Sequence, residues 1–181
     1  FNNRLVYLNM SILDYIFPKQ CLLCSRIGTD ICDCCIKKLS HTLPACFVCN
    51  KLNNNYLTHS DCLNNQVQCL TGWYPTKEMI NKLKVQGSKG IYSTYSSLMN
   101  SLIKYFGIQD LISKSSIRPI HSKNMRVNRY ISSTLSKRSN SNEDILLVGT
   151  HIEDVNLLKD QISQLYTPNI RVLVLFNSTP Q

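Results

Sequence analysis

Four closely spaced pairs of metal-binding residues lie within the first 69 residues of this 181-residue chain. The two members of each pair are separated by two residues, and the pairs are Cys21/Cys24, Cys32/Cys35, Cys46/Cys49 and His59/Cys62. Two ligands at this spacing can point into one tetrahedral site, because the turn between them folds the chain back, and two pairs complete the shell of a Zn²⁺ ion. The pattern predicts two structural zinc sites, since four protein ligands leave no position for water or substrate.

The spacing leaves open how the four pairs combine. The first two pairs can form one site and the last two the other, but a cross-braced arrangement uses the same residues. It also leaves open whether His59 is a ligand, because a loop histidine is commoner than a metal-bound one. Cys34 and Cys69 are predicted to be spare thiols. Redox chemistry is the rival interpretation of a Cys-x-x-Cys pair, but thioredoxin-type motifs occur singly and in a βαβ context.

Basic residues are concentrated in the middle third of the chain. The formal net charge is +9, and residues 77–138 alone hold twelve Lys and Arg against two acids. Such a stretch attracts polyanions, although a solvated lysine-rich surface is the alternative. The predicted nucleic-acid contacts are Lys82, Lys84, Lys89, Lys123, Arg126 and Arg129. Lysines favour phosphate contact over base readout, and the helical spacing of the tyrosines in this stretch favours core positions.

We expect no membrane span, because no segment approaches about 18 consecutive apolar residues. The apolar residues from Leu5 to Ile16 have the spacing of a helix, without the unbroken apolar run and cleavage site of a signal peptide. The expected location is therefore cytoplasmic, where thiols stay reduced and bind metals rather than form disulfides.

After Cys69 the pattern changes to alternating helices and strands. One strand is expected to end near Tyr74, and three more are expected at 117–121, 144–148 and 170–176. A helix is expected to begin at Pro75 and to be broken by Gly87 and Gly90. Three further helices are expected at 92–105, 128–137 and 155–166. The strand, helix and strand from residue 144 to residue 176 indicate a right-handed βαβ unit and a parallel sheet covered on both faces. We expect a zinc module with an N-terminal helix in residues 1–69 and an α/β domain in residues 70–181. Ligands of such sheets bind beyond the carboxyl ends of the strands.

Together these residues resemble the ComF family, competence-associated proteins that join an N-terminal zinc module to a type I phosphoribosyltransferase-like domain. The segments that carry the resemblance are Ile12–Cys24, the later cysteine pairs, Met79–Gly87, Pro119–His121, Arg126–Asn128 and Val172–Pro180. The resemblance implies a phosphoribosyltransferase-like sheet flanked by helices and a role in DNA uptake. It also implies proteins of the DNA-uptake machinery as partners, whereas the basic middle third favours single-stranded DNA as a partner.

The loop after Val148 departs from the family pattern. Type I phosphoribosyltransferases carry two adjacent acids there for the ribose hydroxyls of phosphoribosyl pyrophosphate, and then a turn whose N–H groups hold its phosphate. In this chain the positions of that substrate-phosphate loop are occupied by Gly149, Thr150, His151, Ile152, Glu153 and Asp154. Its first two residues replace the paired acids, and its last two place carboxylates where they repel a phosphate. We interpret Glu153 and Asp154 as ordinary helix N-terminal acids and assign no catalytic residue.

These observations favour a ComF-like protein of DNA uptake. It would act as a zinc-stabilised single-stranded-DNA-binding or adaptor module whose phosphoribosyl-pyrophosphate site is lost. One alternative is an active phosphoribosyltransferase with an altered site, which would need Mg²⁺. A second alternative is a decayed copy with little function of its own.

Overall fold

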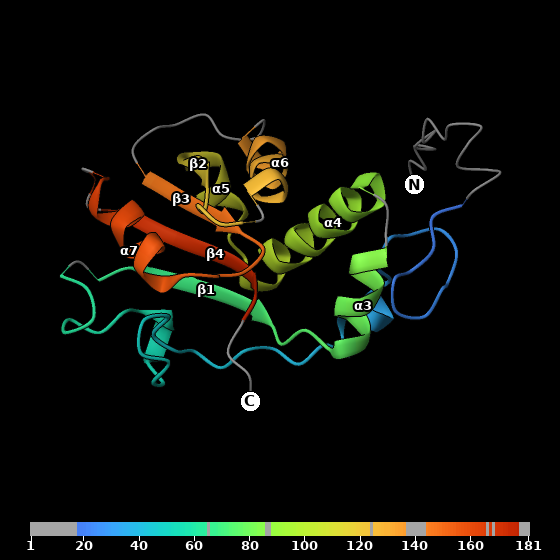
Figure 1. Ribbon diagram of the computed structural model, residues 1–181, viewed down its shortest axis with the longest axis horizontal. Coiled ribbons are helices and arrows are strands. Elements are labelled where there is room, and N and C mark those ends of the chain that lie inside the picture. The colour runs from blue at the N-terminus through green and yellow to red at the C-terminus, as the bar shows by residue number, and fades with distance from the viewer. Residues whose placement is uncertain are drawn as a thin grey trace, which may run out of the picture.

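The computed structural model describes residues 18–64, 66–85, 88–123, 125–136, 144–165, 167 and 169–177. It has an α/β fold built on a four-stranded parallel sheet flanked by helices (Figure 1). The strands are β1 (Gln68–Trp73), β2 (Ser115–Pro119), β3 (Asp144–Gly149) and β4 (Ile170–Phe176). The helices are α2 (Asp33–Ile36), the 3₁₀ helix η1 (Asn54–Tyr56), α3 (Lys77–Val85), α4 (Ser88–Phe106), α5 (Gln109–Lys114), α6 (Met125–Ser136) and α7 (Val155–Ser163). The α/β class with a parallel sheet is thus confirmed.

The strand order across the sheet is β1-β4-β3-β2, and all neighbours are parallel. Leu147 of β3 lies beside Arg118 of β2 on one side and beside Val172 of β4 on the other. The two central strands are buried along nearly their whole length. Strands covered on both faces read as continuous apolar runs rather than as alternating ones, and this is why the sequence located β3 and β4 well.

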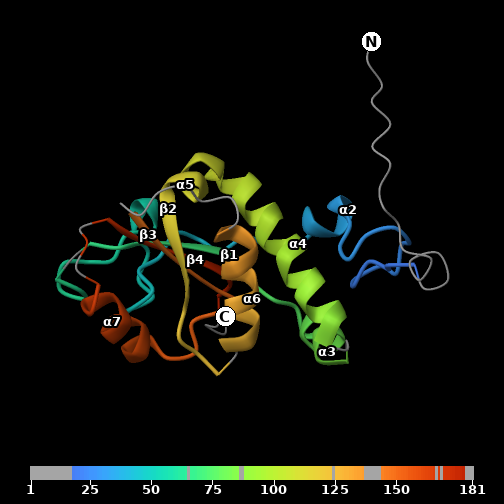
Figure 2. The same cartoon turned by 90° about the horizontal axis from the view of Figure 1, so that it is seen from above.

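Helices cover both faces of the sheet, with α4 and α6 on one face and α7 on the other (Figure 2). On the first face Leu102 and Ile131 pack in one core with Leu173, and on the second Leu158 packs in another core with Val172. Strands β2, β3 and β4 follow one another in a single direction across the sheet. Helix α6 follows β2 on one face of the sheet, and α7 follows β3 on the other.

Helix α4 differs from its expected form. It begins at Ser88, so Gly90, which was expected to end a helix, lies inside its first turn. One helical glycine costs about 1 kcal/mol, and the buried face containing Leu98, Met99 and Leu102 offsets it. Tyr105 does not face the core as expected, since 55% of its surface is exposed. Helix α5 has no counterpart in the predicted elements.

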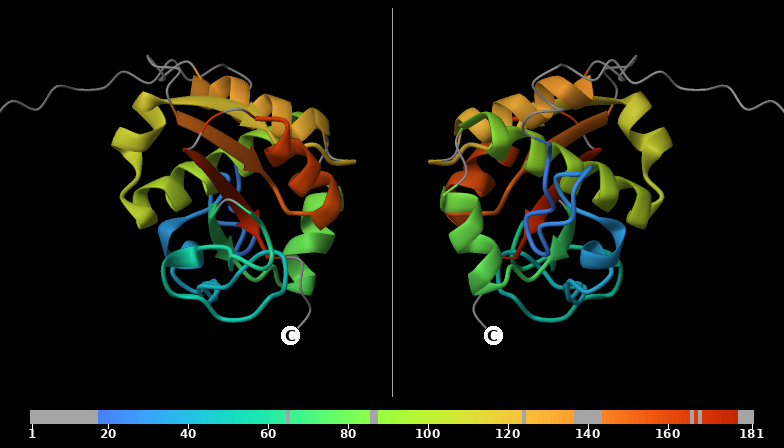
Figure 3. Two further views of the ribbon diagram at one scale, coloured as in Figure 1. Left: turned by 90° about the vertical axis from the view of Figure 1, so that its left-hand side faces the viewer. Right: turned by 90° about the vertical axis from the view of Figure 1, so that its right-hand side faces the viewer.

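The first part of the cysteine-rich region, residues 18–36, lies beside α3 and α4 (Figure 1). The segment of residues 41–57 lies along the β1 edge of the sheet, away from β2 at the opposite edge (Figure 3). Its backbone pairs with the outer edge of β1, since the N–H of Thr42 donates to the C=O of Gly72 at 3.0 Å and Leu57 forms a bridge with Gln68. The segment thereby protects an edge strand that would otherwise expose unpaired backbone groups. Residues 69 and 70, where the predicted module boundary falls, both lie within β1.

Several sequence-based expectations lie outside the described residues. These are the helical stripe from Leu5 to Ile16, Gly87 and the end of the chain at Pro180. Among the helices of the described residues, none combines the length and apolarity that a bilayer crossing requires.

Candidate metal centres and the loop after strand β3

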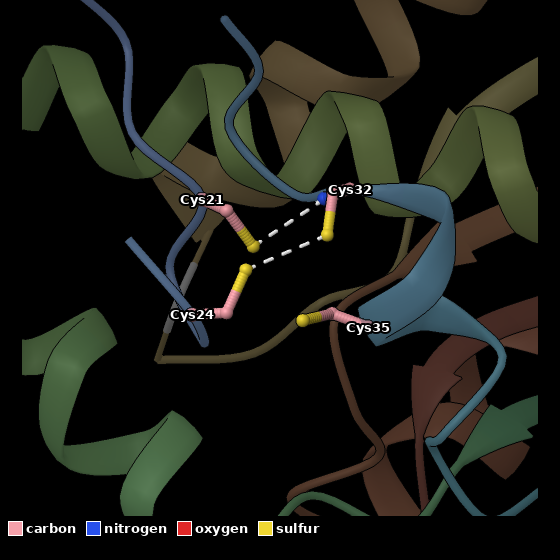
Figure 4. A group of neighbouring side chains, drawn as sticks. All are labelled: Cys21, Cys24, Cys32 and Cys35. Carbon is pink, nitrogen blue, oxygen red and sulfur yellow. Dashed lines mark hydrogen bonds between the residues drawn. The ribbon is translucent and has the colours of Figure 1, made fainter. Parts of the chain in front are cut away.

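The eight predicted ligands gather into two groups, in the order in which they occur along the chain. In each group the four ligand atoms lie within 4.8 Å of one another. The first cluster is Cys21, Cys24, Cys32 and Cys35, and the second cluster is Cys46, Cys49, His59 and Cys62. The pairing that the spacing left open is therefore sequential rather than cross-braced. Figure 4 shows the four thiols of the first cluster facing one another from two neighbouring segments.

Both clusters begin with the same tight turn. The segments 21–27 (CLLCSRI) and 46–52 (CFVCNKL) carry corresponding residue types at every position. Ser25 and Asn50 have positive φ angles of 59° and 58°, and each donates its N–H over 2.8 Å to the C=O of the first cysteine of its turn, Cys21 or Cys46. The left-handed conformation at this position returns the chain across the cluster. This seven-residue repeat is visible in the sequence but was not used in the predictions above.

Backbone N–H groups in these turns are arranged to stabilise a thiolate. Burial raises the pKa of Cys21, but hydrogen bonds from the backbone of Cys24, Cys32 and Leu23 outweigh it and lower the pKa to about 6. The N–H of Cys32 lies 3.4 Å from the sulfur of Cys21. The pKa of Cys46 is lowered to about 6 in the same way, against burial. The first cysteine of each turn thus has the charge state that a metal ligand needs.

One thiol of each cluster, Cys35 in the first and Cys62 in the second, resists ionisation in the absence of a cation. Burial, together with hydrogen bonds to neighbouring thiols, raises the pKa of Cys35 to about 12 and that of Cys62 to about 11. Several thiolates within 4.8 Å of one another repel. A bound divalent cation would remove this repulsion, so the two donor sets fit a metal ion of the kind that prefers sulfur and imidazole ligands.

The two clusters differ in their access to solvent. In the first only Cys24 is exposed, whereas in the second only Cys46 is buried. A hollow of about 410 Å³ opens beside the second cluster, lined by Cys49, His59, Cys62 and six neighbouring residues. His59 belongs to this cluster, since its Nδ1 lies 3.3 Å from the sulfur of Cys49. The predicted spare thiols belong to neither cluster: Cys34 is exposed, and Cys69 is buried, which raises its pKa.

Polar contacts hold the first cluster against helices α3 and α4. The carboxylate of Asp30 accepts hydrogen bonds from Lys19 at 3.2 Å and from the Ser93 hydroxyl at 2.6 Å. The ammonium group of Lys82 donates to the C=O of Leu23 at 3.0 Å and lies 2.8 Å from Glu78. Lys82, a predicted nucleic-acid contact, is therefore engaged within the protein.

The other predicted nucleic-acid contacts lie on different elements. Lys84 and Lys89 occur in α3 and α4, and their side chains lie outside the described residues. Lys123 is exposed just before α6, and Arg126 and Arg129 are exposed on α6 itself. The described part of the chain supplies no salt-bridge partner for any of these last three.

Groups of the protein itself bind and cover the start of the loop after β3, so we call this loop closed. Thr150 is buried, and its N–H donates to Oδ1 of Asn128 at 3.0 Å. Gly149 is packed so closely that a Cβ added there would lie 2.9 Å from the Ile120 side chain. Ile152 lines a small cavity of about 70 Å³ between this loop and the second cluster, and this cavity also includes Cys46. Neither Gly149 nor Thr150 offers a group to an external ligand.

The two acids of the loop have different roles. Asp154 is the N-cap of α7, and its carboxylate accepts the N–H groups of Asn156 at 2.9 Å and Leu157 at 3.2 Å. Glu153 lies before the helix, accepts the N–H of Lys123 at 2.6 Å and lies 3.2 Å from Nε2 of His151. Only Asp154 is thus the helix N-terminal acid that we expected, whereas Glu153 ties the loop to the segment after β2.

The sequence-based selection of site residues missed the role of Asn128. Its side chain is fully buried and donates to the C=O of Ile120 and to the hydroxyl of Ser122, both at 2.9 Å. The sequence offered one signal: a polar residue at a core-facing position of α6, beside Ile131 and Leu135 in the helical period. A buried amide needs partners on all sides, and these partners come from loops that only the fold brings together.

Comparisons with known proteins identify no relative of this chain. No protein-family model matches this chain, and neither the curated proteins nor the solved structures contain a detectable match. What the two clusters and the closed loop do must therefore be inferred from their own geometry and chemistry.

Proposed function

We propose that this chain is a ComF-like, zinc-stabilised binding module that contacts single-stranded DNA and does not transfer phosphoribosyl groups. The main support for the loss of phosphoribosyl transfer is the closed loop after β3. At the position where a phosphoribosyltransferase-like sheet would hold the substrate phosphate, the carboxylate of Asp154 already accepts the N–H groups of the first turn of α7. Helix N-termini bind phosphates through those N–H groups, and a carboxylate in their place repels the phosphate electrostatically.

The experiment that tests the closed loop is a calorimetric titration with phosphoribosyl pyrophosphate and Mg²⁺. We expect no binding heat up to millimolar ligand. Mg²⁺-dependent binding at micromolar strength would contradict the proposal and favour the active-enzyme alternative, in which Mg²⁺ serves as a cofactor. The protein used must first be shown to hold its metal ions, so that a negative result does not report an unfolded chain.

Zinc is the metal that the two donor sets favour. A Cys₄ set and a Cys₃His set suit tetrahedral Zn²⁺, which would cross-link the segments of each cluster and contribute to folding. The first cluster would hold it through four thiolates, and the second through three thiolates and His59. Metal analysis of the purified protein should find about two zinc ions per chain, and a value well below one would contradict this assignment. Thiols free for zinc fit the cytoplasmic location expected from the sequence.

Single-stranded DNA is the partner that the charge distribution favours over a neutral ligand. We expect binding to weaken steeply as salt is raised, because phosphate contacts release counterions. Fluorescence anisotropy with a labelled oligothymidine measures this directly, and an absence of binding at low salt would contradict the proposal. Proteins of the DNA-uptake machinery are further candidate partners, on the basis of the family resemblance alone.

A further inference from the structure

Helix α6 presents one exposed stripe of a distinctive composition. Arg126, Arg129, Tyr130 and Ser133 are all exposed, whereas Asn128, Ile131 and Leu135 are buried. Residues three and four positions apart lie on the same side of a helix, so the four exposed residues form a continuous strip. Two arginines thus lie beside one tyrosine on the solvent side of a helix whose other side packs on the sheet.

The tyrosine in this strip is held by a second aromatic ring. The rings of Tyr130 in α6 and Tyr92 in α4 are stacked, with centroids 4.9 Å apart and planes 25° from parallel. The two helices pack against each other (Figure 2). Even so, 42% of the surface of Tyr130 remains exposed. Because Tyr92 already restricts the Tyr130 side chain in the folded protein, stacking of a further planar group on Tyr130 costs little additional side-chain entropy.

The charge around this strip has one sign over a long stretch of sequence. Residues 111–142 contain no Asp or Glu, and among the described residues neither Arg126 nor Arg129 forms a salt bridge. The carboxylate of Glu153, which accepts the N–H of Lys123 just before α6, also lies 3.2 Å from Nε2 of His151. The two guanidinium groups are therefore available for an anionic partner.

We propose that this surface, Arg126, Arg129 and Tyr130 with the supporting Tyr92, is where single-stranded DNA binds. The Tyr130 ring stacks on an unpaired base, and the two arginines contact the adjacent phosphates. The inference rests on the proposed function and narrows it to one surface. Duplex DNA does not fit this mode, because its bases are already stacked on one another.

The test compares two probes of equal backbone charge, an oligothymidine of about 20 nucleotides and an abasic strand of the same length. Affinities are measured by fluorescence anisotropy at low and at moderate salt. The variants are Tyr130→Ala, Tyr130→Phe, the double variant Arg126→Ala/Arg129→Ala, and Arg118→Ala as control. Arg118 is an exposed arginine of the same basic stretch, but its neighbour Ile117 faces the α6 side of β2, so Arg118 points to the other face of the sheet.

We expect Tyr130→Ala to weaken oligothymidine binding by about tenfold and to leave the abasic strand unaffected, whereas Tyr130→Phe keeps the stacking ring and binds like the wild type. The double variant should weaken binding to both strands and lower the salt slope by about two. Arg118→Ala should stay within about twofold of the wild type. Circular dichroism and metal content establish that each variant is folded. If Tyr130→Ala fails to fold, the surface is tested with the double variant alone, which is expected to fold because Arg126 and Arg129 are both exposed.

The outcomes separate this inference from the proposed function. If the wild type binds oligothymidine but Tyr130→Ala and the double variant bind equally well, the surface is wrong and the proposed function stands. Equal losses of Tyr130→Ala on both strands would overturn the stacking mode. If the wild type binds neither strand at low salt, the proposed function fails and this inference fails with it.

Discussion

The side-chain oxygen of Asn128 accepts the N–H of Thr150 at 3.0 Å, and this one bond joins helix α6 to the loop after β3. The amide of the same side chain donates to the C=O of Ile120, the residue that follows β2. Asn128 is fully buried, so each of these groups would be left without a partner if it were removed. The loop at the carboxyl ends of β2 and β3 is thus closed from inside the protein.

Replacing this amide should be costly. Asn128→Ala removes a partner from Thr150, Ile120 and Ser122 at once, and we expect it to lower the free energy of unfolding by about 2–4 kcal/mol. Urea unfolding measures the change. The matched control is Ser133→Ala, an exposed position of the same helix, which should stay within about 0.5 kcal/mol of the wild type. Equal stability of the two variants would contradict the role assigned to Asn128.

Adjacent cysteines should behave differently towards metal. Cys35 belongs to the first cluster and Cys34 does not. Cys35→Ser should therefore lower the zinc content of the purified protein from about two ions per chain to about one, because three ligands hold zinc weakly. Cys34→Ser should keep about two ions. Equal zinc content in the two variants would remove Cys35 from the ligand set.

The stability of the protein should depend on the ionisation of His41. Burial lowers the pKa of His41 below its ordinary value of 6.5, against a hydrogen bond to the backbone of Gly72 that raises it. As the pH falls below 6.5, the unfolded chain takes up the proton first, so the folded state loses stability. This contribution is fully present above the unfolded pKa and is lost as the pH falls through the folded pKa.

The variant His41→Phe isolates this effect. In the wild type the ring centroids of His41 and Tyr105 are 3.8 Å apart, and the phenyl ring of the variant can keep this stacking. Urea midpoints are compared between about pH 7.5 and about pH 5.5. We expect the wild type to lose more stability than the variant over this range. Metal release at acid pH affects both proteins alike, so parallel curves would mean that His41 makes no contribution.

The N-cap of α7 should contribute a modest, local stabilisation. Asp154→Ala leaves the N–H groups of Asn156 and Leu157 without their acceptor, and we expect a loss of about 1 kcal/mol in the free energy of unfolding. Asp160→Ala, at an exposed position within the same helix, serves as control. A loss no larger than that of the control would show that the cap is not formed in solution.

The contacts of Asp30 should control how firmly the first cluster is held. Asp30→Ala removes the acceptor of Lys19 and Ser93, so the first cluster should release zinc to a chelator several-fold faster, while release from the second cluster is unchanged. Asp33→Ala is the control, since Asp33 is exposed near the same cluster. Two-phase release followed with a zinc indicator separates the clusters. Equal acceleration of both phases would point to general destabilisation instead.

The sequence predicted the elements whose signals are local. Strands β3 and β4 were located within one residue, because they are apolar over their whole length. Prediction was poorer where exposure depends on distant segments. Tyr105 and Tyr130 occupy positions of helical spacing that favour the core, yet both are exposed, and they stack on His41 and Tyr92 respectively.

The sequence alone singled out the eight residues that form the two clusters able to hold a metal ion, since two residues between ligands is a local geometry that a short turn provides. It also determined the parallel α/β class, through apolar runs that alternate with amphipathic helices. Only the tertiary structure decided that the pairs combine sequentially, that Asn128 and Asp154 close the loop after β3, and that Tyr130 stacks on Tyr92 at the surface. Each of these depends on which distant segments pack together, and such packing is set by the whole chain rather than by local spacing.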